Sequence, residues 1–183
     1  SRAAIALTFP CRFMLVAAMN PCPCGWFGDP FHECSCTPGM IERYMSRISG
    51  PLLDRIDIHI EVPRLTSDEL GEKPTGENSA TIRERVNGAR KKQIERYKDR
   101  EDIYCNAHLG PKDVRKFCSL DSESKNLLLL AVEKFGLSAR AYDRILKVAR
   151  TIADIDNVEN IRPEHISEAI QYRSLDRKFW LHA

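Results

Sequence analysis

The residues of this chain best suited to chemistry are four cysteines near its beginning. They form two Cys-x-Cys pairs, with nine residues between the pairs: Cys22 and Cys24, then Cys34 and Cys36. Four thiolates bind Zn²⁺ in tetrahedral geometry, and such a site leaves no open position for water. The intervening loop contains two glycines and is free enough to close on itself. The spacing therefore indicates a zinc site with a structural role.

Another interpretation of this loop stays open, because a reduced, metal-free loop with some cysteines buried has the same sequence. His32 is a spare ligand candidate. Cys11, Cys105 and Cys118 are scattered, which favours buried small hydrophobic side chains. The seven cysteines are an odd number, and the chain has no signal-peptide layout. A cytoplasmic protein with a metal site is therefore favoured over a secreted disulfide framework.

Composition sets wider limits. The 183 residues are 43% hydrophobic, enough for one domain with a core or for two small ones. A net charge of +2, with 30% charged residues, argues neither for nor against a nucleic-acid partner. No run approaches 18 apolar residues, so no membrane-spanning helix is expected. The chain begins at Ser1 without Met and reads like the middle of a longer protein.

The first third of the chain is predicted to consist of strands and loops. Residues 12–20 are almost continuously apolar and suit a strand buried on both faces. A loop rich in Cys, Pro and Gly follows at 21–39, and 40–49 could form a short helix. At 54–63 isoleucine and valine alternate with polar residues, the period of a half-buried strand, which Pro63 would end.

The remainder is predicted to be helical after a polar linker at 64–78. A long helix from 79 to about 104 is expected to face inward with Ile82, Val86, Ala89 and Ile94. Its mixed-sign charges indicate a solvated face. Further helix boundaries are predicted from caps, proline and glycine: Pro111 and Pro163 at helix starts, Asp121 and Ser138 as N-caps, and Gly136 after a C-terminus.

Strands followed by helices suggest an α/β part and a separate all-α bundle. The division is 1–63, a linker at 64–78, and a helical domain at 79–183. Two strands are too few for an independent sheet, so the α/β core is expected to be incomplete. Runs 12–20 and 55–62 should then be non-adjacent, exposed or covered by another chain, with self-association as a consequence.

Four segments resemble magnesium-chelatase-like AAA+ ATPases of the competence-protein type. They are FPCRFMLVAAMNPCPCG at 9–25, YMSRISGPLLDRID at 44–57, LSARAYDRILKVARTIAD at 137–154 and EAIQYRSLDR at 168–177. The resemblance implies an incomplete AAA+ α/β core carrying the sensor 1 and arginine-finger strands, followed by a helical lid. It also implies ATP and Mg²⁺ as cofactors of the full-length protein.

The resemblance assigns three roles. Asn20 matches sensor 1, which holds the attacking water, and Arg55 matches an arginine finger acting on the neighbouring subunit's nucleotide. Arg140 matches sensor 2, which reaches back from the lid to the phosphates. Each has a structural alternative: a strand-ending turn at Asn20, local ion pairs of Arg55 with its aspartate neighbours, and a solvated basic face around Arg140.

The sequence contains neither G-x-x-x-x-G-K-[ST] nor an apolar strand ending in Asp-Glu. The resemblance puts both before residue 1, so this chain alone is expected not to hydrolyse ATP. For the full-length protein it implies a homo-oligomeric ring, a hexamer, that works on DNA. In such motors a hairpin enters the pore, and residues 1–10 look like its returning strand with Arg2 near the tip. The alternatives are the ATPase subunit of a magnesium–porphyrin chelatase and a zinc-stabilised interaction module.

Overall fold

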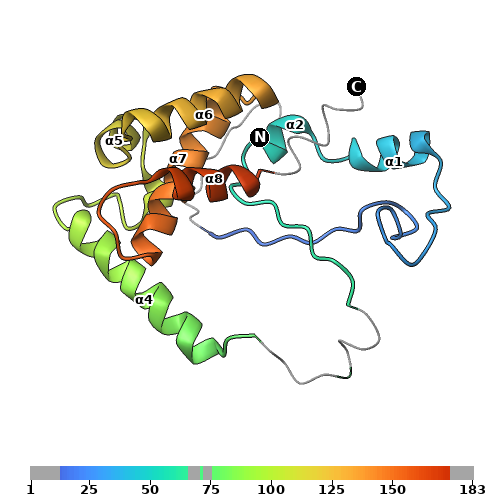
Figure 1. Cartoon of the computed structure of the whole chain (residues 1–183), viewed down its shortest axis with the longest axis horizontal. Coiled ribbons are helices and arrows are strands. Elements are labelled where there is room, and N and C mark those ends of the chain that lie inside the picture. Colours follow the sequence, from blue (N-terminus) through green and yellow to red (C-terminus); the bar gives the residue numbers. More distant parts are fainter. Residues whose placement is uncertain (1–12, 66–70, 72–75, 174–183) are drawn as a thin grey trace, which may run out of the picture. The chain divides into compact units, whose positions relative to one another are not determined.

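The computed structural model describes residues 13–65, 71 and 76–173, and it divides into two compact units at Arg47 and Ile48. In the described part of the first unit, 13–20 run as an extended segment into a looped region, followed by α1, Pro38–Met45 (Figure 1). Hairpin residues 1–10 lie outside the described part of the chain. The predicted short helix at 40–49 is therefore present in part as α1, which begins at a proline.

The second unit is helical. It begins with α2, Gly50–Leu53, and an extended segment, and continues with α4, Ser79–Arg96, and the short 3₁₀ helix η1, Asn106–His108. Four more helices complete it: α5, Pro111–Phe117; α6, Ser122–Phe135; α7, Ala139–Ile155; and α8, Pro163–Gln171. Helix α7 is central, because it packs against α4, α5 and α8 (Figure 1).

The helix boundaries predicted from caps, proline and glycine are confirmed. Asp121 accepts a hydrogen bond from the Ser124 amide at 2.7 Å, and Ser138 accepts one from the Ala141 amide at 3.2 Å. Gly136 ends α6 with φ of 60°, the left-handed conformation that glycine adopts most easily. Pro111 and Pro163 lie in the first turns of α5 and α8.

The core of the helical unit is formed mainly by α7 and α8. Ile145 and Ala149 of α7, and Ile166 of α8, are completely inaccessible to solvent. The partly buried side chains of Val148 and Tyr142 pack against the same cluster. Burying an aliphatic side chain of this size stabilises the folded state by about 1.5–3 kcal/mol. The predicted apolar stripe of α7 is therefore confirmed, and Cys118 is buried beside it as expected.

The two predicted strands are wrong for this structure. Residues 13–20 and 56–63 carry no strand, and residues 54 and 55 form the turn that ends α2. An isolated parallel bridge between Leu120 and Ile161 lies elsewhere in the described part. A strand forms only when a neighbouring segment supplies its hydrogen-bond partners, and none of the described residues does so here. The expected exposure is present: Met14 and Val62 are each 87% exposed.

The long helix also differs from its prediction. It ends at Arg96 rather than near 104, and Ile82, Val86 and Ile94 are 41–58% exposed instead of inward-facing. Ala89 is buried as expected, and Gln93, one turn later, is buried as well. Helix α4 contacts α7, so only its C-terminal half enters the core. The bounds 63 and 78 of the predicted domains stay predictions. No helix in the described ranges has the length and apolar character needed to cross a bilayer.

Candidate functional site

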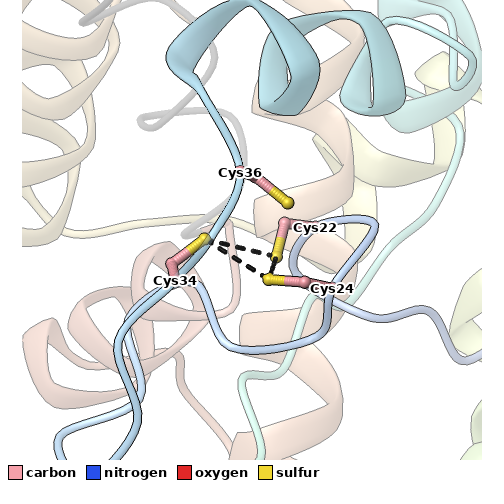
Figure 2. Close-up of side chains that lie close together, drawn as sticks. All are labelled: Cys22, Cys24, Cys34 and Cys36. Carbon is pink, nitrogen blue, oxygen red and sulfur yellow. Dashed lines mark hydrogen bonds between the residues drawn. The ribbon is translucent and has the colours of Figure 1, made fainter.

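The four cysteines of the first unit converge on one point (Figure 2). The Sγ atoms of Cys22 and Cys24 lie 3.3 Å apart, and Cys34 Sγ lies 3.7 and 3.5 Å from them. Cys36 completes a group whose ligand atoms all lie within 4.8 Å of one another. Four sulfurs bound to one Zn²⁺ at about 2.3 Å would be about 3.8 Å apart. The arrangement therefore fits one tetrahedral ion.

Two tight turns bring the pairs together. Gly25 has φ of 86° and donates its amide to the Cys22 carbonyl at 3.1 Å. A side chain at this position would be strained, and its Cβ would lie 3.8 Å from the Asn20 amide nitrogen. Asp29 then accepts the amides of Phe31 and His32 at 2.8 and 2.9 Å. These turns reverse the chain between the two cysteine pairs.

The protonation of the thiols also favours a cation. The amide of Trp26, and hydrogen bonds with Cys22 and Cys36, lower the pKa of Cys24 to about 5. The Cys36 amide acts to lower the pKa of Cys34, but loss of water and the neighbouring thiols outweigh it and raise this pKa to about 12. Ionisation of one thiol thus makes ionisation of its neighbours less favourable. A bound divalent cation removes that opposition, since it stabilises all four thiolates together.

The spare ligand candidate is engaged elsewhere. The ring of His32 stacks on Trp26 with 4.3 Å between centroids, and His32 Nδ1 lies 3.5 Å from Asp29. The donor set in the structure is therefore the four sulfurs. Such a closed set would hold zinc in a structural role, because no position is open for a substrate.

We expect protein prepared under reducing conditions to contain about one zinc per chain, with Zn–S distances near 2.3 Å. Elemental analysis and X-ray absorption measure these quantities. Cys34→Ser should reduce the zinc content strongly, whereas the control Cys105→Ser, outside the cluster, should not. Protein free of metal in this assay would support the reduced loop instead.

The three residues assigned by resemblance are all exposed. Asn20 ends the extended segment of the first unit, directly before Pro21. Arg55 follows α2 and donates from Nη1 to the Pro51 carbonyl at 2.7 Å. Arg140 lies in the first turn of α7. Their catalytic and nucleotide-binding roles stay predictions.

The proposed structural alternatives for the two arginines find little support. Asp57 forms an ion pair with Arg144, and Asp54 lies 3.9 Å from Arg173, so both aspartates face partners other than Arg55. Around Arg140, Arg144 is ion-paired and Lys147 is half-buried, donating to the Ala107 carbonyl at 3.1 Å. Burial lowers the pKa of Lys147. The alternative of a solvated basic face is therefore not supported at Arg144 and Lys147.

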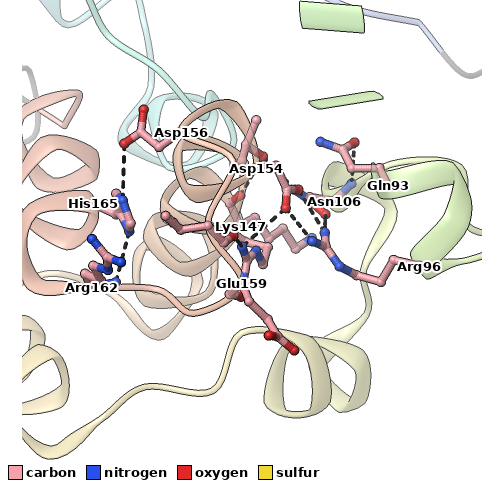
Figure 3. Close-up of polar contacts among 12 residues, drawn as sticks. Gln93, Arg96, Asn106, Lys147, Asp154, Asp156, Glu159, Arg162 and His165 are labelled. Atoms are coloured by element: carbon pink, nitrogen blue, oxygen red, sulfur yellow. Dashed lines mark hydrogen bonds and ion pairs between the residues drawn. The ribbon is translucent and has the colours of Figure 1, made fainter. Parts of the chain in front are cut away.

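A second polar cluster is structural. Asp154 of α7 is buried and accepts from Arg96 of α4 at 2.8 Å and from Asn106 of η1 at 2.9 Å (Figure 3). Arg150, one turn earlier on α7, lies 3.3 Å from the same carboxylate. Burial acts to raise the pKa of Asp154, but the hydrogen bonds from Arg96 and Asn106 hold it below its ordinary value. The cluster joins α4, η1 and α7.

The sequence analysis did not single out Arg173 or Asp154, and it treated Arg144 only as part of a possible solvated face. The one available signal was spacing: Arg150 and Asp154 carry opposite charges one turn apart on α7. Charged residues at such positions are almost always paired when buried.

Two protein-family models match this chain, and together they cover most of it. The family described as magnesium chelatase, subunit ChlI, C-terminal, matches residues 76–173, and the family described as magnesium chelatase, subunit ChlI, matches 1–70.

Relatives resemble the chain over most of its length. The Escherichia coli protein YifB is 43% identical over 97% of this chain and 34% of its own length. The Haemophilus influenzae competence protein ComM is 44% identical over 97% of this chain and 34% of its own length. A Mycobacterium tuberculosis protein is 34% identical over 90% of this chain and 32% of its own length. The chain thus spans about a third of the relatives it matches.

Proposed function

The chain belongs to the magnesium-chelatase-like family, and we propose on that basis that it is the C-terminal part of an AAA+ ATPase that moves DNA as a homo-oligomeric ring. The full-length protein would bind ATP and Mg²⁺ through residues upstream of this chain. The residues described here would contribute Asn20, the trans-acting Arg55 and the lid residue Arg140.

The observation that carries this proposal is that the side chains of Arg55 and Arg140 are exposed, while neighbouring charged side chains form ion pairs with other residues of the chain. Asp57 and Arg144 pair with each other. Phosphoryl transfer is catalysed mainly by positioning and by neutralising charge on the phosphate oxygens, for which guanidinium groups are well suited. An exposed arginine on a backbone fixed by packing can serve such a role.

The choice of DNA over a porphyrin rests on the relatives. One of them is named a competence protein, which favours DNA handling, while the family description names magnesium chelatase. The cysteine cluster supports the competence-protein type, to which the loop belongs by resemblance. A magnesium–porphyrin chelatase subunit remains the second candidate.

The test is ATP hydrolysis by the full-length protein with and without DNA. We expect single-stranded or forked DNA to stimulate hydrolysis, the protein to assemble into a ring with ATP, and this 183-residue chain alone to be inactive. A metal-free porphyrin supplied together with Mg²⁺ provides the matched comparison. Hydrolysis that responds to porphyrin and not to DNA would select the chelatase alternative, and a full-length protein without ATPase activity would leave only the zinc-stabilised module.

A further inference from the structure

The segment 54–59, which carries Arg55 in the turn after α2, is tied to the helical domain, although it was expected to be part of a sheet. Asp57 forms an ion pair with Arg144 of α7, in which the two side chains are 46% and 26% exposed. The His59 amide donates to the Tyr172 carbonyl, just after α8, at 2.7 Å. These contacts join residues that are far apart in the sequence within one compact unit.

A third contact is buried. Arg173, only 1% exposed, donates to the Ile56 carbonyl, and its guanidinium lies 3.9 Å from Asp54. A charged group held this deeply is costly unless it is hydrogen-bonded, so this contact specifies where the segment can lie. The segment is therefore held on both sides of residue 55, by Arg144 of α7 and by the residues that directly follow α8.

Arg55 itself is left outside this set of contacts. Its amide donates to the Leu52 carbonyl at 2.9 Å, which continues the turn of α2, and its side chain is exposed. Leu53, two residues earlier, is buried. The backbone of Arg55 is thus fixed from both directions, while its exposed guanidinium donates to the Pro51 carbonyl and is not held by the helical domain.

The helix that holds the segment also carries the proposed lid sensor. Arg140 and Arg144 are one turn apart on α7, so they share a face. A rotation of α7 that moves Arg140 also moves Arg144, and through the ion pair it moves Asp57. Arg55 is two residues from Asp57 on a backbone held by packing, so a displacement of Asp57 displaces Arg55 as well.

We propose that Arg144, with Arg173, is a positioning residue for Arg55, and that lid and finger segment turn as one body. This inference rests on the proposed function. The nucleotide state of one subunit, sensed at Arg140, would then set the reach of Arg55 toward the neighbouring subunit's nucleotide. The Asp57–Arg144 ion pair would transmit the movement of α7 to the segment, and the buried Arg173 would hold the segment in place.

The test is a charge reversal in the full-length protein. Arg144→Asp and Asp57→Arg should each lower kcat by on the order of tenfold, the effect expected of a broken coupling contact, with KM for ATP nearly unchanged. The double reversal should restore kcat, because the pair is re-formed with exchanged signs. The control Lys98→Asp breaks an exposed pair with Glu95 on α4 and should change neither constant.

Hydrogen exchange supplies a readout independent of catalysis. The peptide containing the His59 amide should exchange faster in each single reversal and regain protection in the double one. Parental kcat in Arg144→Asp rings, or no recovery in the double reversal, would overturn the positioning role. If Arg55→Ala also turns over at the parental rate, the finger assignment itself fails and the inference falls with it, which is a distinguishable result.

Discussion

Arg55→Ala in the full-length protein should leave ATP binding nearly intact and reduce turnover by ~10³-fold or more. The reason is that an arginine finger neutralises charge that develops only on the transferred phosphoryl group, so its loss acts on the transition state and not on the bound substrate. Titration of ATP binding and steady-state hydrolysis measure the two effects separately.

Mixed rings distinguish a residue acting in trans from one acting in its own subunit. Arg55→Ala subunits should regain turnover when combined with subunits defective in the phosphate loop, since an intact finger then faces an intact pocket. Arg140→Ala should weaken binding, turnover or both, and should show no such rescue. Parental hydrolysis by Arg55→Ala rings would make Arg47, in the same family-like segment, the next candidate.

The second large effect is on stability. Asp154→Ala should destabilise the chain by about 3–5 kcal/mol, because it leaves Arg96 and the buried Arg150 without their shared carboxylate. Urea unfolding followed by circular dichroism measures the change. Asp154→Asn keeps a hydrogen-bond acceptor for Arg96 and should cost less.

The matched control is Glu95→Ala, next to Arg96 on α4. Its partner Lys98 and Glu95 itself are 60% and 73% exposed, so the loss of stability should be far smaller than for Asp154→Ala. Equal effects of the two substitutions would mean that the buried cluster contributes no more than a surface pair.

The stability contributed by Asp154 should also depend on pH. Its folded-state pKa is held below the ordinary value, so the contribution is complete above the unfolded pKa of about 3.9 and is lost as pH falls toward the folded one. Asp154→Asn should flatten this part of the stability curve. An unchanged acid limb would contradict the assignment.

Local chemistry in the sequence determined much of the helical domain. The caps Asp121 and Ser138, Gly136 and the prolines at helix starts act within one turn of the backbone, so their effect does not depend on distant residues. The cysteine cluster could be predicted for a similar reason, because a short loop with a glycine turn brings thiols at that spacing together. The family followed from four long motifs that are spread from residue 9 to residue 177.

Contacts between distant segments decided the rest. Alternation at residues 54–63 predicted a strand, but a strand requires a partner segment, and this one donates a backbone hydrogen bond to the turn after α8 instead. The apolar stripe of α4 predicted burial for Ile82 and Val86, but both are exposed. How much of a helix is buried depends on which part of it contacts its neighbour, here α7. The pairing of Asp57 with Arg144 is likewise absent from any local pattern. Whether a charge is solvated, buried in a pair or free to reach a ligand is set by the three-dimensional neighbours, and only the tertiary structure supplies them.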